Sequence, residues 1–466
     1  MTGYVNTKII ATVGPSSSSF EVIEQLASLG VSGFRINFAH GEPSLWKSWI
    51  EIIRETEKSI GRPLAIIGDL VGPSIRIGVL EEPITLSPGD VAEIVYGEKA
   101  KGGSERIIPL PLRRVFEVVE EGDILVMNDG RVKLRVIDVR GLRIRVEALT
   151  PARITSRKAI VILNRDPGLP ALTERDMQCL RFALDNELDY VALSYVRGGE
   201  DIAVLKTLIA NEGGDVGVAA KIETRSAVEN LSSIIEESDI VIVARGDLGM
   251  NYGLEEIPLL QEHIVYETRR RGKPVIVATQ ILESMIDNPV PTRAEVMDVA
   301  TAVKQGVDAL MLTGETAIGK YPVEAVKWLR KIIRRIEERY PPQKFPPSDH
   351  QWAYASSIVE TAERLNASHI LVYSIGGTLP PKIAASRPLV KTIIGVGDVA
   401  RARRLVIVWG LHLRHVVAEG YEDGLHKLIK ELCRNGEIHP GELIIKAYRE
   451  AHNKHVIIVE KMYGCN

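Results

Sequence analysis

Short apolar runs alternate with amphipathic segments at the start of the chain. Three apolar runs, at residues 7–13, 33–38 and 64–70, each have the length of a strand. The segments between them, 20–29 and 46–60, carry apolar residues at helical spacing. Such runs are typical of strands buried on both faces of a parallel sheet, and such segments of the helices that connect them. The pattern therefore predicts three consecutive strand–helix units.

The same alternation resumes after residue 172. Five further strands are predicted at 190–194, 216–222, 240–244, 274–278 and 309–312. Helices are predicted at 173–186, 224–238, 258–271 and 323–339, and another from Pro291. Eight strands result, each followed by a helix except where the third is interrupted. This count predicts an α/β protein with a (β/α)8 TIM barrel, whose active site lies at the C-terminal ends of the strands.

The interruption after the third strand has a different pattern. Its runs are short and alternate apolar with polar residues, at 74–79, 91–96, 124–127, 131–139 and 142–148, and helical periodicity nearly vanishes. Asn128-Asp129-Gly130 is a strong hairpin signal. We therefore predict a small β-barrel-like domain, inserted after strand 3 and hinged at Pro73 and Pro167.

A proline-rich linker begins at Tyr340 and leads into a last segment. There a helix at 350–365 and strands at 370–373, 392–396, 405–409 and 456–460 predict a separate α/β domain. The expected organisation is a first part of the barrel at 1–72, an inserted β lid domain at 73–168, a second part of the barrel at 169–340, and a C-terminal α/β domain at 341–466.

Composition excludes several classes of protein. A net charge of −3 argues against binding to nucleic acid or to an anionic membrane. No apolar run approaches the roughly 20 residues needed to span a bilayer, and the N-terminus has no apolar signal core. The three cysteines are scattered and form no CxxC pair, so we expect few disulfides and a cytoplasmic location.

Polar and charged residues gather where the predicted barrel strands end. Any one of them alone is most simply read as a salt-bridging residue at a strand end. Because the carboxyl ends of parallel barrel strands meet at one rim, the whole set favours a single site there. The set comprises Arg35, Asn37, Asp69, Ser194, Lys221, Glu223, Asp247, Thr279, Thr313 and Glu315.

The residue types at this rim suit phosphate chemistry. Glu223 and Asp247 end neighbouring strands, and Mg2+ is usually held by one or two carboxylates plus substrate phosphates. Arg35 and Lys221 are suitable phosphate ligands. Together they provide the positioning and charge neutralisation that phosphoryl transfer requires. A mobile β domain above the barrel mouth would exclude water from the reaction.

These residues lie in stretches that resemble the pyruvate kinase family over the whole chain. The matching stretches are TKIIATVGPSS (7–17), RINFAHG (35–41), GDLVGPSIRIG (68–78), LPALTERD (169–176), AKIET (220–224), VARGDLGM (243–250), GKPVIVATQILESM (272–285), PTRAE (291–295) and LTGETAIGKYPVEAV (312–326). The resemblance implies a glycolytic phosphotransferase that converts phosphoenolpyruvate and ADP to pyruvate and ATP with Mg2+ or Mn2+. It also implies a homotetramer with an allosteric, phosphorylated effector on the C-terminal domain.

The resemblance also implies roles for individual residues. Lys221 and Arg35 would act on the moving phosphoryl group, and Thr279 would lie near the carbon that is protonated. Gly246, Asp247 and Thr279 would hold the pyruvate end, and Glu223 and Asp247 the Mg2+. The nucleotide would contact Asn37, His40, Arg76 and, from the lid, Lys158.

Two departures from the family pattern concern K+. The resemblance implies a K+ site that includes Asn37 and Asp69, but Ala39 stands where the family has a serine ligand, and Ser74 where it has a glutamate. Both changes lower the affinity for K+, so we predict an enzyme that works without it. Asp69 would then need cationic neighbours, for which Arg35 and Arg76 are the candidates.

Two other functions are alternatives to the phosphotransferase. A Mg2+-dependent lyase or aldolase that handles a pyruvate enolate would use the same acids and an arginine, but it has no need of a β lid or a nucleotide. A phosphoenolpyruvate sensor without catalysis should lack Lys221 or a metal ligand, and all of these are present.

Overall fold

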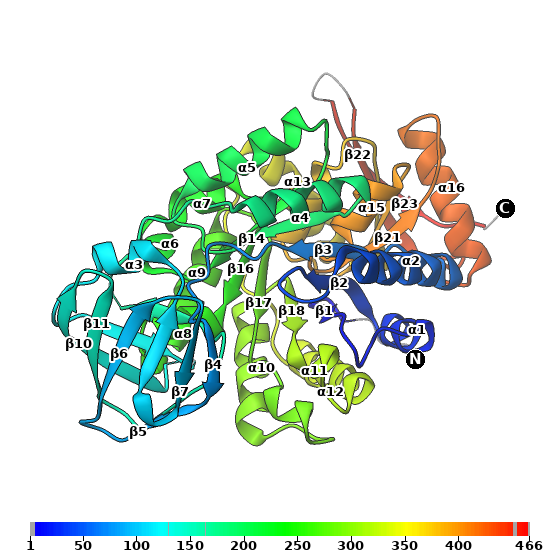
Figure 1. Cartoon of the computed structure of the whole chain (residues 1–466). Coiled ribbons are helices and arrows are strands. Elements are labelled where there is room, and N and C mark those ends of the chain that lie inside the picture. Colours follow the sequence, from blue (N-terminus) through cyan, green and yellow to red (C-terminus); the bar gives the residue numbers. More distant parts are fainter. Residues whose placement is uncertain (1–4, 129, 164, 451–453, 465–466) are drawn as a thin grey trace.

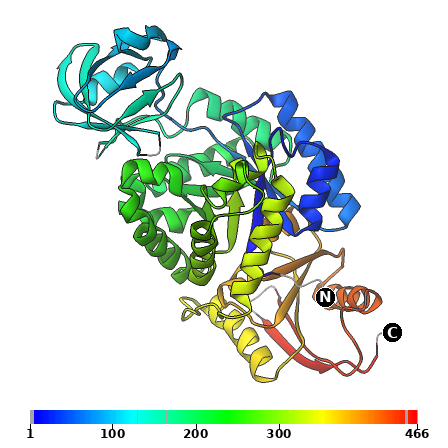
Figure 2. The same ribbon diagram turned by 90° about the horizontal axis from the view of Figure 1, so that it is seen from below.

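The fold comes from a computed structural model that describes residues 5–128, 130–163, 165–450 and 454–464. Three bodies are visible: a central barrel, a β-rich body at one end of it and a C-terminal body at the other (Figures 1 and 2). No helix in the described part of the chain is long and apolar enough to cross a membrane.

Eight parallel strands close into a barrel in the order β1-β18-β17-β16-β15-β14-β3-β2. Closure is made by β1 and β18, where Lys8 lies opposite Ala309. The strands are β1 (Lys8–Thr12), β2 (Val31–Asn37), β3 (Ala65–Asp69), β14 (Tyr190–Leu193), β15 (Gly217–Ile222), β16 (Ile240–Ala244), β17 (Val275–Ala278) and β18 (Ala309–Leu312). The predicted TIM barrel is therefore confirmed.

Helices surround the barrel, and two of them differ from prediction. The expected helix at 224–238 is split at Asn230, and the helix expected from Pro291 starts two residues later, where Thr292 caps it with Glu295 in a capping box. The helices are α1 (Phe20–Ser28), α2 (Pro43–Ile60), α4 (Glu174–Asp185), α5 (Gly199–Asn211), α6 (Arg225–Glu229), α7 (Leu231–Glu237), α8 (Arg245–Asn251), α9 (Ile257–Arg270), α10 (Arg293–Gln305), α11 (Gly314–Ala317) and α12 (Pro322–Glu337).

Alternate strand residues face the two sides of the barrel wall. Buried residues such as Ile10, Ile67, Ile242 and Met311 form an interior cluster that continues into the core of the C-terminal domain. The residues between them pack outward against the helices. The interior of the barrel is therefore filled with side chains, and polar residues at the strand ends can come together only at its rims.

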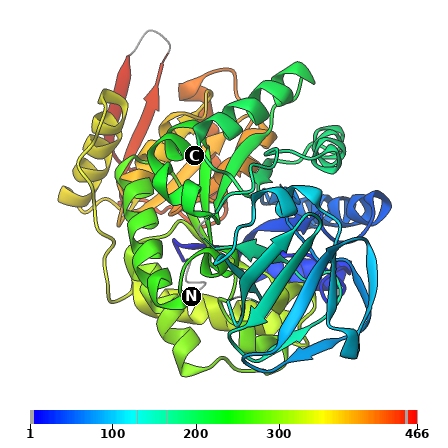
Figure 3. The same cartoon turned by 60° about the vertical axis from the view of Figure 1, so that its left-hand side comes forward.

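The inserted body has a core of its own and lies in front of the barrel mouth (Figure 3). Its main sheet has the order β13-β9-β10-β11-β6-β8, with two-stranded pairs β4-β7 and β5-β12 beside it. The strands are β4 (Val79–Glu82), β5 (Ile84–Leu86), β6 (Val91–Tyr96), β7 (Lys99–Gly102), β8 (Ile107–Leu110), β9 (Ile124–Met127), β10 (Val132–Arg140), β11 (Arg143–Ala148), β12 (Ala152–Ile154) and β13 (Ile160–Ile162).

Two predictions about the insert were wrong. Residues 74–78 form no strand and make a single bridge, between Arg76 and Ala159. A short helix, α3 (Arg113–Val118), lies where no helix was expected. Asp129 of the predicted hairpin lies outside the described residues, but the flanking strands β9 and β10 do pair antiparallel.

The C-terminal domain is a five-stranded sheet, β21-β20-β19-β22-β23, flanked by helices. The strand predicted at 405–409 was wrong, because the chain there leaves helix α15 and forms a turn. Its elements are α13 (His350–Arg364), β19 (His369–Ser374), α14 (Leu379–Ala385), β20 (Lys391–Val396), α15 (Val399–Leu405), β21 (Leu411–His415), α16 (Tyr421–Arg434), β22 (Leu443–Arg449) and β23 (His455–Lys461). Cys179 is free, whereas Cys433 is disulfide-bonded, against expectation.

Buried ion pairs fasten this domain to the N-terminal ends of the barrel strands. Arg387 binds both carboxylate oxygens of Asp308, at 3.0 and 3.1 Å, and donates to the carbonyl of Gly306. Both side chains are less than 5% exposed. Asp308 immediately precedes β18 and also accepts the backbone N–H of Val275, where β17 starts. The C-terminal domain thus holds β17 and β18 at their N-terminal ends.

Replacing Arg387 with Met should destabilise the fold by about 3–5 kcal/mol, because the charge of Asp308 would remain buried without its partner. Chemical denaturation followed by fluorescence would measure this loss. Lys320→Met is the matched control, since Lys320 and Asp287 form an ion pair with both side chains about two-thirds exposed. Equal effects of the two substitutions would show that burial does not strengthen the Arg387 pair.

Candidate active site

Lys221 lies at the centre of the rim where the barrel strands end. Its ammonium is 2.7 Å from Glu223 Oε1 and 3.3 Å from Asp69 Oδ1, and it donates to the hydroxyl of Ser194 at 2.8 Å. These partners come from β3, β14 and β15, whose order in the sheet is consecutive. The predicted convergence of strand ends therefore brings Asp69, Ser194, Lys221 and Glu223 together.

Arg35 joins this cluster from β2. Its guanidinium forms a salt bridge to Asp69 Oδ2, at 2.7 Å from Nε and 2.6 Å from Nη2, and donates to Thr12 Oγ1 at 3.2 Å. Asp69 thus has Arg35 on one carboxylate oxygen and Lys221 on the other. The two cations that the acid requires are Arg35 and Lys221. Arg76, the other predicted candidate, bonds instead to the backbone carbonyl of Arg157.

The cluster keeps its charges over a wide pH range. Burial by itself lowers the pKa of Lys221, but the carboxylates of Asp69, Glu223 and Asp247 outweigh it and hold the pKa above its ordinary value. Burial raises the pKa of Asp69, yet Lys221 and Arg35 outweigh this, so its pKa lies below its usual range. The contribution of ionised Lys221 to the stability of the fold is fully present below about pH 10.4, and that of ionised Asp69 above about pH 3.9. Each is lost only beyond those limits, as the pH crosses the shifted pKa.

Glu223 is held from three sides. Its Oε2 accepts the backbone N–H of Tyr195 at 2.8 Å, and its carbonyl accepts the side-chain amide of Asn251. The same amide donates to the carbonyl of Asp247 at 3.1 Å. Asn251 therefore ties the two predicted Mg2+ ligands to each other through their backbones, although nothing in the sequence pattern pointed to it.

The two carboxylates fit a divalent cation. Glu223 Oε1 is buried and makes no hydrogen bond; its one close partner is the ammonium of Lys221. Within the described residues no group of three or more His, Cys, Asp or Glu is arranged to hold a metal. Two carboxylates with substrate oxygens completing the shell is the usual arrangement for Mg2+.

Thr279 lies in a strained turn after β17. Thr279 and Gln280 both have left-handed backbones, with φ of 67° and 52°, which is unfavourable for a β-branched residue. The Thr279 hydroxyl accepts the N–H of Gly246 at 2.8 Å. The hydroxyl hydrogen is not used in this bond and remains available to another acceptor.

The side chain of Arg245 holds this turn in place. It donates to the carbonyls of Thr279, at 2.7 and 3.2 Å, and of Gln280, at 2.9 Å. It is 6% exposed and is itself fixed by Asp298 at 2.6 Å. The sequence pattern placed Arg245 only at a helix start, because a left-handed threonine leaves no mark in a sequence.

The predicted nucleotide ligands form two pairs. Asn37 ends β2 on the barrel and His40 lies in the turn after it, and Asn37 Oδ1 accepts the N–H of Ala39 at 3.1 Å. Arg76 and Lys158 are exposed on the insert, on either side of the bridge between Arg76 and Ala159. Throughout the described chain no hydrogen bond or ion pair joins one pair to the other.

Thr313 and Glu315 were also predicted at the rim, and the carboxylate of Glu315 binds backbone N–H groups there. Glu315 is 1% exposed and accepts the N–H groups of Leu282 and Thr313, at 2.9 and 2.8 Å. It shapes the loops after β17 and β18, and among the described residues no hydrogen bond or ion pair joins it to the Lys221 cluster.

Comparison with known proteins gives a consistent result. Residues 4–326 match the family described as pyruvate kinase, barrel domain, and residues 353–454 match pyruvate kinase, alpha/beta domain. The pyruvate kinase of Aeropyrum pernix is 40% identical over 94% of this chain and 95% of that protein. That of Pyrobaculum aerophilum is 41% identical over 91% of each.

Solved structures agree. The crystal structure of pyruvate kinase from Pyrobaculum aerophilum superposes with a TM-score of 0.88 and 39% identity, covering 98% of this chain and 100% of that one. A pyruvate kinase from Cryptosporidium parvum superposes with a TM-score of 0.90 and 31% identity, covering 97% and 96%.

Replacing Arg245 with Lys should lower kcat by about 100-fold, because the strained turn would lose the planar fork that holds both carbonyls while the charge is kept. Steady-state kinetics would show this. Adding Gln280→Gly should restore part of the rate, since glycine adopts the left-handed backbone without help. Asp298→Asn, which leaves the bonds to the turn intact, should cost less. If the glycine gives no recovery, Arg245 does not act through the turn.

Proposed function

This chain belongs to the pyruvate kinase family, and from that premise we propose that the cluster around Lys221 carries the family's reaction. The chain transfers the phosphoryl group of phosphoenolpyruvate to ADP, giving pyruvate and ATP. The observation that carries the assignment to this site is a buried lysine that keeps its charge between two carboxylates, one of which, Asp69, also binds Arg35 from β2.

Lys221 and Arg35 act on the moving phosphoryl group. As this group leaves phosphoenolpyruvate, negative charge spreads over its equatorial oxygens, and fixed cations stabilise it without having to reorganise. Lys221 is fixed by Asp69, Glu223 and Ser194, and Arg35 by Asp69. Their positions are therefore set before substrate arrives.

Glu223 and Asp247 hold Mg2+, or Mn2+ in its place. When bound, the ion neutralises charge on the substrate's phosphate and carboxylate oxygens. The chain's own part is to keep the two carboxylates in place, which it does through Tyr195 and Asn251. Lys221 and the ion would share the carboxylate of Glu223, since the ammonium is 2.7 Å from its Oε1.

The pyruvate end lies against Gly246, Asp247 and Thr279. Since the hydroxyl of Thr279 accepts a hydrogen bond from Gly246, its own hydrogen is available to the substrate. It is therefore placed to hold the proton that the enolate takes up. Asn37 and His40 on the barrel, with Arg76 and Lys158 on the insert, receive ADP when the insert closes as a lid.

We also propose an effector site, an oligomeric state and a cellular location. A cavity of roughly 220 Å3 beside the loop after β19, lined by Ser374, Gly376, Thr378 and Arg449, supports a phosphorylated effector on the C-terminal domain. We propose a homotetramer, from the family resemblance, and a cytoplasmic location, where the other reactions of glycolysis supply phosphoenolpyruvate.

Replacing Lys221 with Met should lower kcat about 10²–10³-fold, the usual cost of removing one preorganised group that stabilises transition-state charge, and leave phosphoenolpyruvate binding largely intact. Pyruvate formation would be measured with and without ADP, and binding by calorimetry. A near-normal kcat with a raised KM would show that Lys221 only binds substrate. Pyruvate formation without ADP would favour a lyase instead.

Potassium should be unnecessary, because Ala39 and Ser74 remove a hydroxyl and a carboxylate of the family pattern, and the oxygens that remain already have partners. Asn37 Oδ1 accepts from Ala39, and Asp69 is paired on both oxygens. In tetramethylammonium buffer with saturating Mg2+, adding KCl should change kcat less than about twofold. Ala39→Ser with Ser74→Glu should increase the response to K+. A many-fold rise on adding KCl to the unmodified protein, absent with a tetramethylammonium salt, would refute K+ independence.

A further inference from the structure

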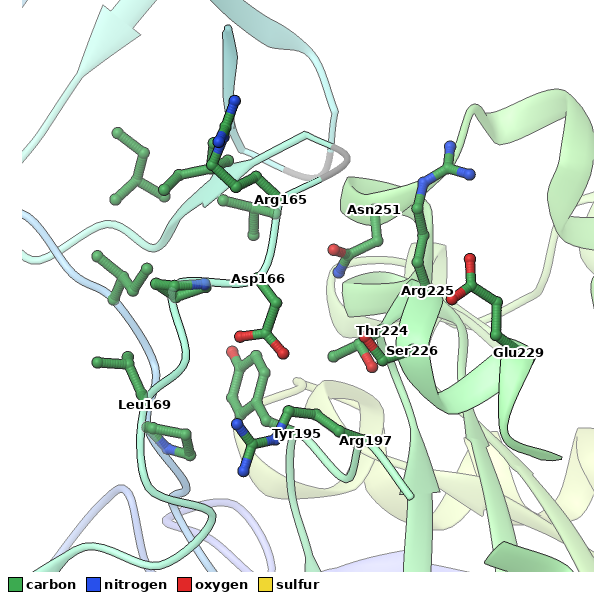
Figure 4. A pocket seen from close by; sticks show the side chains of 16 residues that line it. Arg165, Asp166, Leu169, Tyr195, Arg197, Thr224, Arg225, Ser226, Glu229 and Asn251 are labelled. Carbon is green, nitrogen blue, oxygen red and sulfur yellow. The ribbon is translucent and has the colours of Figure 1, made fainter. Parts of the chain in front are cut away.

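A second cavity, of roughly 190 Å3, lies where the inserted domain joins the barrel (Figure 4). Its apolar wall is formed by Ile75, Ile160, Ile162 and Leu169, from the insert and the segment that returns to the barrel. Its polar wall is formed by Tyr195, Thr224, Arg225, Ser226 and Asn251, from the loops after β14 and β15, the start of α6 and the end of α8. We call these residues the hinge pocket.

The hinge pocket is distinct from the reaction site. Arg35, Asp69, Lys221, Asp247 and Thr279 do not line it. It adjoins that site, because Tyr195 and Asn251 line the pocket and also hold Glu223 through hydrogen bonds.

Arg225 is the cation of this pocket with donors to spare. Arg165 is paired with Glu120 and Asp123, and Arg197 with Asp201. Arg225 instead stacks on the ring of Tyr252, with its guanidinium carbon 4.2 Å from the ring centroid. Its Nε is buried and has no hydrogen-bond partner, and no ion pair to it is found among the described residues. Because Nε is closed off from solvent, the donors of Arg225 left for an anionic acceptor are its Nη groups, for which no hydrogen bond is found among the described residues either.

The rest of the lining restricts what that ligand is. Asp166 and Glu229 also line the pocket and would repel a molecule with several negative charges, such as a nucleotide or a bisphosphate. The aliphatic wall favours an apolar body. We propose that the hinge pocket binds a small organic monoanion, with an apolar body against Ile160, Ile162 and Leu169 and one anionic group at Arg225.

Binding there would affect catalysis without competing with substrate. The ligand would touch both the insert and the barrel, so it would hold the angle between them, which the proposed lid closure must change. The expected result is a lower kcat that added phosphoenolpyruvate or ADP does not restore. This kinetic part rests on the proposed function; the binding part does not.

Benzoate is a suitable probe, and benzyl alcohol is its neutral counterpart of similar size. Calorimetry should show that benzoate binds the full-length protein more tightly than benzyl alcohol does. Arg225→Gln should weaken benzoate binding about tenfold, the loss of one charge-assisted hydrogen bond, and leave benzyl alcohol unaffected. Leu169→Asn should weaken both. Arg364→Gln, at a side chain 83% exposed on the C-terminal domain, is the charge-matched control and should change neither.

Three results would overturn the proposal. One is no benzoate binding at millimolar concentration. Another is binding that Arg225→Gln and Leu169→Asn leave unchanged. The third is inhibition that phosphoenolpyruvate relieves, which would place benzoate in the reaction site. Since calorimetry needs no turnover, a failure of the proposed catalytic roles would appear in the kinetics of the unliganded protein and would leave the binding result to stand alone.

Discussion

A buried lysine that must stay charged is the constraint on which the rim depends. Removing an ammonium from water costs several kcal/mol unless carboxylates surround it, and Lys221 has three nearby, Asp69, Glu223 and Asp247. With Arg35 included, these five groups carry a net charge of −1. A divalent cation would change this to +1, so the site becomes attractive to a phosphorylated anion only after the metal has bound. The same side chains that stabilise the folded rim therefore favour an order of binding.

This arrangement also requires that the strands do not slip, and the opposite end of the barrel provides that restraint. Asp308 precedes β18 and is clamped by Arg387; Asp215 precedes β15, the strand of Lys221, and pairs with Arg404 at 2.6 Å. Both arginines belong to the C-terminal domain. The C-terminal domain thus binds the entry points of strands whose exits carry the proposed chemistry, and the buried Arg387 pair contributes more than the Asp215 pair, whose carboxylate side chain is 87% exposed. Because the barrel strands are closely packed, a displacement of the C-terminal domain would be transmitted along them to the rim.

The sequence allowed prediction of the barrel and most of the rim because both depend on local pattern. Each strand is a short buried run, and its last residues project at a known end of the sheet. The errors have equally local causes. Residues 405–409 are apolar because they are buried between domains, and burial alone does not distinguish a strand from a turn. The roles of Arg245 and Asn251 could not be predicted, since they act on backbone carbonyls whose positions exist only in the folded chain.

Tyr195 connects Glu223, the proposed metal ligand, to the insert, and its backbone explains how. Its φ of 55° is unusual for a bulky residue, and it directs the N–H to Glu223 while the ring turns toward the insert. There its hydroxyl donates to Ser74 at 3.3 Å, the first residue beyond the hinge at Pro73. A rotation of the insert that moves Ser74 would therefore strain or break this bond, and Tyr195 also carries the donor that fixes Glu223. We infer that Tyr195 links movement of the insert to the carboxylate of Glu223, where the proposed metal would bind.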